Sequence, residues 1–264
     1  HGIVSTIMNT PRRILGISDS KSVFVDAHKQ PLLLQLARDQ TSTPSGTTPC
    51  ICYIGAATGD RPDRIASFFN LAQRAGFRPT SLDLFAMKTG NPRAYFANAD
   101  VVFIDGGVTR NLIALFREWN VVDALIEAYQ QGALVVGASA GISMLFEWCV
   151  SDSIKSDIQP VKGIQLLKGS FCAHYDALES RRNTLAELVR SEPSALPAYG
   201  LEDGVAILFE NEQLVETFAV RRNAKLHLFQ PSDGGISHGQ SIGRRLNAMS
   251  LPGLGHYRAI RGAR

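Results

Sequence analysis

A serine lies at the centre of a five-residue segment framed by glycines, Gly-Ala-Ser-Ala-Gly at positions 137–141. The apolar run before it, residues 133–136, predicts a buried strand, and residues 142–148 can form a helix. A serine on a tight turn between a strand and a helix is typical of a nucleophile elbow, where small neighbours let the backbone approach closely. Ser139 would then be the nucleophile, and the N–H of Ala140 could stabilise an oxyanion. The pentapeptide alone fits equally well an ordinary turn in which Ser139 only caps the helix.

A second glycine turn, Asp-Gly-Gly-Val-Thr at positions 105–109, follows an apolar run at residues 101–104. Parallel strands bring the turns that follow them to the same edge of a sheet, so this turn should lie beside the elbow. The N–H of Gly107 is therefore a second candidate oxyanion donor. The turn lacks the glycine spacing and the lysine of a phosphate-binding loop. A simpler interpretation is a turn in which Thr109 caps the next helix.

A serine nucleophile needs a general base, and the chain contains six histidines. His174 has the most suggestive setting, because the short run at residues 169–173 would end at the carboxyl edge of a strand and leave the imidazole beside the elbow. His28 and His227 adjoin no such turn. A lone histidine is more often structural or exposed than catalytic, so the interpretation of His174 depends on the elbow.

The rest of the chain supplies the elements that must hold these turns. Short β-branched runs alternate with longer amphipathic segments, which predicts a parallel sheet covered by helices on both faces. The predicted strands are residues 51–54, 81–84, 101–104 and 134–136, and the predicted helices are residues 62–75, 111–119 and 122–131.

The pattern changes after position 200. Residues 205–209 and 214–220 predict an antiparallel hairpin that finishes the sheet, and residues 226–229 predict a further strand. We expect one catalytic domain over residues 10–229, followed at 230–264 by a partly mobile tail rich in Gly, Ser and Arg.

Composition narrows the class of protein. With 264 residues, of which 45% are hydrophobic and 19% charged, the chain can bury one continuous core. It lacks an apolar run of about eighteen residues and an export signal, so we expect a soluble cytoplasmic protein with no membrane partner. A net charge of +3 without a basic patch does not indicate nucleic-acid binding. The four cysteines lack the spacing of a metal or redox site and are expected to be reduced.

The two glycine turns and the histidine segment together resemble the peptidase E and cyanophycinase family of serine peptidases. The resemblance covers residues 49–229, and its marks occur in order along the chain. They are residues 106–115, 139–141, 150–153, 169–176 and 199–204. The resemblance implies a flavodoxin-like three-layer α/β/α sandwich with a mostly parallel sheet, related to class I glutamine amidotransferases. It also implies catalysis by a Ser–His pair with an acidic partner.

Carried over position by position, the resemblance makes Ser139 the nucleophile, His174 the base, and the N–H groups of Gly107 and Ala140 the oxyanion donors. Asp152 aligns best with the acidic partner of the family. The loop that carries the acid varies in length between branches, so three other carboxylates stay open as alternatives. These are Glu147, Glu179 and Asp203.

The activity implied by the resemblance is hydrolysis of small peptides, dipeptides above all, without a cofactor. In the aspartyl dipeptidase branch an arginine receives the acidic side chain of the N-terminal residue, and Arg181 is the matching position. Glu179 and Thr109 would line the same substrate site. An exposed helix face is the alternative interpretation of Arg181. Homodimer formation is left open.

Three departures from the family pattern concern substrate preference. Val108 stands where many relatives have Asn, Ala173 where a proline is common, and residues 16–20 lack a glycine cluster. Other classes of protein remain as alternatives: a serine esterase or other small-molecule hydrolase, or a catalytically idle binding module on the same fold. A glutamine amidotransferase would need a cysteine in place of Ser139.

Overall fold

The computed structural model describes residues 11–24 and 30–246. Within these ranges the strands form two sheets. The larger sheet consists, in order, of β14 (Arg244–Arg245), β11 (Gln213–Ala219), β10 (Val205–Glu210), β1 (Arg13–Ile17), β5 (Leu134–Ala138), β4 (Val101–Ile104), β2 (Cys50–Ile54) and β3 (Arg78–Ser81). The smaller sheet consists of β13 (Gly235–Ile242), β12 (Lys225–Ser232), β9 (Ala198–Leu201), β8 (Leu167–Cys172), β6 (Phe146–Ile154) and β7 (Asp157–Lys162).

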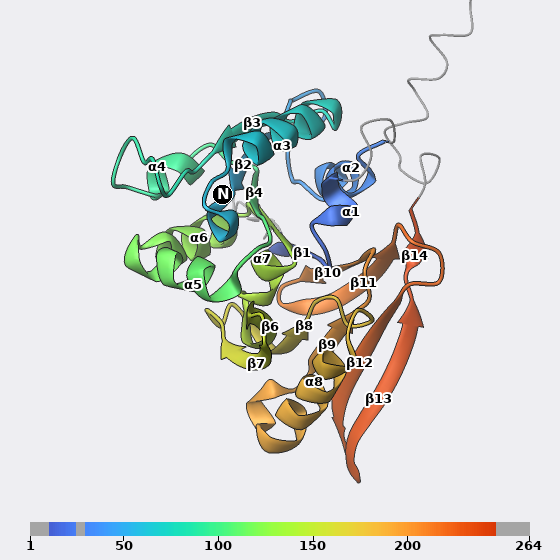
Figure 1. The fold of residues 1–264 in the computed structure, drawn as a ribbon. Coiled ribbons are helices and arrows are strands. Elements are labelled where there is room, and N and C mark those ends of the chain that lie inside the picture. Colours follow the sequence, from blue (N-terminus) through green and yellow to red (C-terminus); the bar gives the residue numbers. More distant parts are fainter. Residues whose placement is uncertain (1–10, 25–29, 247–264) are drawn as a thin grey trace, which may run out of the picture.

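The larger sheet separates two hydrophobic cores. Side chains alternate along its strands: in β2, Ile51 and Tyr53 enter one core, whereas Cys52 and Ile54 enter the other. Helices cover both faces (Figure 1). The first core is closed by α1 (Lys21–Phe24), α2 (Leu32–Asp39) and α3 (Pro62–Arg74), and the second by α4 (Arg93–Phe96), α5 (Thr109–Glu118) and α6 (Val121–Gln130). This arrangement is a three-layer sandwich.

The smaller sheet lies beside the sandwich and shares its second core. Phe146 and Phe171 stack on each other there, and the Phe146 ring lies 6.0 Å from that of Phe209 in β10. Helix α8 (Glu179–Ser191) covers the opposite face, where Leu185 and Val150 are buried together. Strands β8 and β9 run parallel, as do β6 and β8, and the long hairpin of β12 and β13 forms one end of the sheet (Figure 1).

The parallel strands β1, β5, β4, β2 and β3 and the antiparallel hairpin of β10 and β11 confirm the sandwich expected from the sequence. The second sheet was not expected. Residues 142–148 form no long helix: the single-turn α7 (Ala140–Ser143) is followed at Phe146 by strand β6, which pairs with β7 and β8. The strand expected at residues 81–84 lies earlier, at β3.

The expected C-terminal tail also differs. Residues 230–246 form the end of β12, then β13 and β14, and β12 joins the smaller sheet. Every residue of β13 is exposed, so no alternation of apolar and polar residues marks this strand in the sequence. Residue 10 and residues 247–264 lie outside the described residues.

All four cysteines are buried and unpaired. Burial raises the pKa of Cys149 and Cys172 to about 12, so these thiols stay protonated and unreactive at neutral pH. In the part of the chain that the structure describes, no helix combines the length and apolarity needed to cross a bilayer. Two short 3₁₀ helices, η1 (Ala56–Thr58) and η2 (Pro193–Ala195), complete the fold.

Candidate active site

Ser139 occupies a strained turn between β5 and α7. Its backbone has φ 51° and ψ −112°, and a positive φ is uncommon for a residue other than glycine. The glycines around it are sterically required, because a Cβ at Gly141 would overlap the carbonyl oxygen of Ile104. A strand, a strained turn and a helix in this order are the arrangement expected at a nucleophile elbow, and Ser139 follows β5 at the carboxyl edge of the parallel strands.

The Ser139 hydroxyl meets the imidazole of His174. The distance from Ser139 Oγ to His174 Nε2 is 2.9 Å, within hydrogen-bonding range. His174 follows β8 of the smaller sheet and also has a positive φ, 53°. The nucleophile and its candidate base therefore come from different sheets, and the close contact between these sheets creates the pair.

The second imidazole nitrogen meets Asp203. His174 Nδ1 and Asp203 Oδ1 are 2.7 Å apart. Strand register explains the contact: β8 and β9 run parallel with Cys172 opposite Gly200, so the residues that follow each strand emerge at the same edge. His174 comes two residues after Cys172 and Asp203 three residues after Gly200.

The structure does not bring Asp152, which the sequence predicted to orient His174, to the imidazole. Asp152 lies in strand β6, and its carboxylate pairs with Arg181 at 3.0 Å and with Lys155 at 3.4 Å. Partial burial would raise the pKa of Asp152, but the charges of Arg181 and Lys155 hold it below its ordinary value. The sequence placed Asp152 in a loop after a helix, but the helix is only the single turn α7, and Asp152 lies within β6.

The other carboxylates considered also have different surroundings. Glu147 accepts a hydrogen bond from the N–H of Gly169 at 3.0 Å, and Glu179 is exposed at the start of α8. His227 contacts Glu202 and His238 in place of a serine. His28 lies outside the described residues.

The second glycine turn lies against the elbow. A Cβ built on Gly106 would be 2.8 Å from Ser139 Cβ, and one built on Gly107 would overlap the carbonyl oxygen of Ala57. Gly107 has φ 145° and no hydrogen-bond partner for its N–H among the described residues. A backbone N–H left free beside a serine can donate to an oxyanion. Thr109, expected to line the substrate site, is buried at the start of α5.

A buried carboxylate beneath this turn was missed in the sequence. Asp105 is fully buried and accepts hydrogen bonds from Tyr53 Oη at 2.6 Å and from two nitrogens of Arg64 at 2.5 and 3.1 Å. Burial, together with the charge of Asp105, raises the pKa of Tyr53 well above its ordinary value. The sequence did contain a sign of this buried carboxylate, because Asp105 stands directly between an apolar strand and a Gly-Gly pair. A charge that is buried at such a position needs hydrogen-bond or ionic partners.

Arg181 belongs to α8 and is buried between this helix and the smaller sheet. Only 6% of its side chain is exposed, and besides Asp152 it donates to the backbone carbonyl of Ala173 at 3.3 Å. Arg181 therefore does not lie on an exposed helix face. Its guanidinium is already paired with Asp152 and with the Ala173 carbonyl. Its contact with the residue before His174 makes it a support for that loop.

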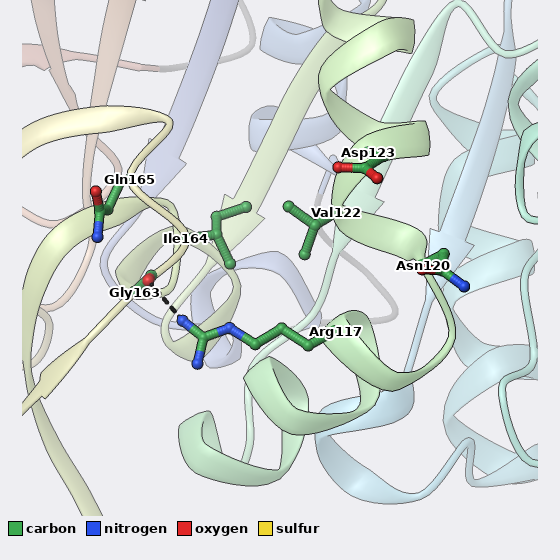
Figure 2. Close-up of a pocket in the computed structure, with 7 residues that line it drawn as sticks. All are labelled: Arg117, Asn120, Val122, Asp123, Gly163, Ile164 and Gln165. Atoms are coloured by element: carbon green, nitrogen blue, oxygen red, sulfur yellow. Dashed lines mark hydrogen bonds between the residues drawn. The ribbon is translucent and has the colours of Figure 1, made fainter.

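A cavity of about 290 Å³ lies away from these residues, between α5, α6 and the segment after β7 (Figure 2). Arg117 reaches across it and donates to the carbonyl of Gly163 at 3.1 Å. Ser139, His174 and Gly107 do not line this cavity, so we assign it no chemistry.

The model of peptidase family S51 matches residues 15–217, which include every residue of the site described above. The chain belongs to peptidase family S51. This confirms the resemblance to peptidase E, and it makes the protein a serine peptidase.

Similar proteins agree with the S51 assignment. An uncharacterized peptidase of Bacillus subtilis (strain 168), YgaJ, is 35% identical over 179 residues, which are 68% of this chain and 77% of that protein. A peptidase from an acI-B1 actinobacterium has a similar structure, with a TM-score of 0.67 at 14% identity over 89% of this chain and 96% of the other. A putative peptidase E protein from Listeria monocytogenes EGD-e has a TM-score of 0.58 at 15% identity, over 80% of this chain and 100% of that chain. The two structures show a shared fold.

Proposed function

We propose that this S51 peptidase hydrolyses small peptides, dipeptides among them, through an acyl-enzyme on Ser139. The observation that carries the proposal is the continuous series of contacts from Ser139 to His174 at 2.9 Å and from His174 to Asp203 at 2.7 Å. A nucleophile, a base and an orienting carboxylate in this order are the parts of a serine-peptidase triad. Asp203 takes the role that the sequence had given to Asp152.

The reaction proceeds in two halves. Ser139 Oγ attacks the scissile carbonyl as its proton moves to His174 Nε2, and the N–H groups of Gly107 and Ala140 stabilise the oxyanion. His174 gives the proton to the departing amine as the C–N bond breaks. Water then attacks the ester with His174 again as base, which releases the acid and regenerates Ser139. Asp203 holds the imidazole with Nδ1 protonated, so that Nε2 can accept.

A fluorophosphonate probe tests this proposal directly, because the probe reacts only with an activated serine. We expect one adduct per chain, located on Ser139 by peptide mass spectrometry, and none on Ser139→Ala. An exposed serine of ordinary reactivity, such as Ser67, provides the internal control. A protein that stays unmodified, as an idle binding module on this fold would, contradicts the proposal.

Arg181 was the predicted binding group for an acidic substrate side chain, but its guanidinium is already paired with Asp152. The substrate side chain therefore needs a different site. A cavity of about 560 Å³ lies on the other side of the glycine turn, between η1, Phe85 and α5. Ala57 and Val108 belong to its wall and flank Gly107, and the Val108 N–H donates to the carbonyl of Ala57 at 2.9 Å. Among the described residues, no charged side chain lines this cavity. We propose that it receives an uncharged, apolar side chain of the substrate.

This assignment predicts the order of rates on matched dipeptides. Leu-Leu should be cleaved with a kcat/KM about tenfold or more above that of Asp-Leu, because burying a leucine side chain is worth about 1.5–3 kcal/mol and an unpaired carboxylate is costly to bury. Ala114→Trp, at an exposed position of α5 that lines the cavity, should lower the rate on Leu-Leu but not on Ala-Ala. Glu118→Trp, exposed on the same helix outside the cavity, is the control. Faster cleavage of Asp-Leu would restore an acidic preference and reject the cavity.

A further inference from the structure

Residues 17–20 are the last residue of β1 and the three that follow it, and they accept hydrogen bonds from four loops of the proposed site. We call them the β1 tip. Each of the four accepts a hydrogen bond from the backbone N–H of a different loop. The Ser139 N–H donates to the Ile17 carbonyl at 2.9 Å, the His174 N–H to Ser18 Oγ at 3.2 Å, the Gly204 N–H to Asp19 Oδ2 at 2.7 Å, and the Gly106 N–H to Ser20 Oγ at 3.1 Å.

Ser18 links the two strands that carry the base and the acid. It is fully buried, and its hydroxyl accepts from the His174 N–H while it donates to the carbonyl of Leu201, at 2.9 Å, in β9. His174 has a positive φ, a conformation that persists only where the surroundings impose it. The Ser18 hydroxyl is one of the groups that impose it.

Asp19 holds the turn that bears Asp203. Only 3% of Asp19 is exposed, and its carboxylate accepts from the N–H and hydroxyl of Ser22 at 2.6 and 2.8 Å as well as from the Gly204 N–H. Gly204 has φ 86° and directly follows Asp203. A buried carboxylate with several donors is a rigid anchor, so it fixes the backbone next to the acid.

Ser20 connects the β1 tip to the oxyanion turn. Its hydroxyl donates to Asp105 Oδ1 at 2.7 Å and accepts from the N–H of Gly106, the residue before Gly107, and that N–H is shared with the same Asp105 oxygen at 2.7 Å. Asp105 is itself fixed by Arg64 and Tyr53. The position of the Gly107 N–H therefore depends on a hydroxyl from the same four residues that hold His174 and Asp203.

We infer that Ser18, Asp19 and Ser20 are positioning residues, which set the spacing between base, acid and oxyanion donor as one unit. The inference rests on the proposed function, since it assigns no contact with the substrate to any of the three. A catalytic group misplaced by about 1 Å can cost about a hundredfold in rate. The loops that carry the base, the acid and the oxyanion donor are all bonded to Ser18, Asp19 and Ser20. Loss of a single hydroxyl from this set should therefore disturb catalysis more than stability.

Ser20 offers the sharpest test, because it is only partly buried and a threonine can keep its hydroxyl. Ser20→Ala should lower kcat for dipeptide hydrolysis and the rate of fluorophosphonate labelling by about tenfold to a hundredfold, with KM little changed. Ser20→Thr should restore both rates to within about threefold of the original. Ser18→Ala should slow labelling similarly, because it releases the backbone of His174. Ser67→Ala removes a hydroxyl bonded to the Asp63 carbonyl far from the site and should change neither rate.

Thermal melts and circular dichroism separate positioning from folding. Activity is to be expressed per folded molecule, and the positioning role requires that the loss persist after this correction. Loss in proportion to the unfolded fraction, or wild-type rates in both Ser20→Ala and Ser18→Ala, would overturn the inference. An unmodified wild-type protein would instead reject the proposed function, so the two failures are distinct.

Discussion

Ser139→Ala and His174→Ala are each expected to lower kcat/KM for dipeptide hydrolysis by at least about a thousandfold while the protein stays folded. The reason is that the two groups, 2.9 Å apart, act together in the acylation step: an alanine at either position leaves no activated oxygen. The measurement is steady-state kinetics on purified variants, with circular dichroism to verify folding.

The double variant supplies the internal control for this prediction. Because the two residues work as a unit, Ser139→Ala with His174→Ala should be no slower than either single variant. Retention of more than about a tenth of the original kcat/KM by either single variant would reject the pair as nucleophile and base. Additive losses would mean that the two residues act in separate steps.

Asp203→Asn is expected to lower kcat by between about a hundredfold and ten-thousandfold. An amide can donate to Nδ1 and so favour the imidazole tautomer with the proton on Nε2, which cannot accept the proton of Ser139. The matched variant is Asp152→Asn, which weakens the ion pair with Arg181 but leaves the contact between His174 and Asp203 intact. It should stay within about tenfold of the original rate.

Kinetics on these two variants decide between the acids, because both replace one carboxylate by an isosteric amide. A slow Asp152→Asn beside a fully active Asp203→Asn would return the role to Asp152. The melting temperatures of both proteins should be measured in parallel, since Arg181 is buried and loses part of its charge compensation in Asp152→Asn.

The candidate nucleophile and base could be proposed from the sequence because their signals are local, and the structure brings Ser139 and His174 together. A serine between glycines after an apolar run implies a strand, a turn and a nucleophile, and the structure gives Ser139 the corresponding strained backbone. The acid could not be chosen this way. Asp203 reaches His174 through the parallel pairing of β8 and β9, a non-local register that neither strand reveals in its own sequence.

The smaller sheet was missed for related reasons. Strand β6 begins at Phe146, where the sequence pattern suggested a helix, and its conformation is set by pairing with β7 and β8. Arg181 illustrates the same limit for side chains. Nothing in its polar neighbours along the chain indicates that it is buried against Asp152 of β6.

The division of the proposed triad between two sheets has a consequence for when the site can form. Ser139 is carried by the larger sheet, whereas His174 and Asp203 follow strands of the smaller one. Neither sheet alone contains a complete hydrolytic site. During synthesis the proposed nucleophile emerges before His174 and Asp203, so under the proposed mechanism a chain that has not yet folded beyond position 203 has no activated serine.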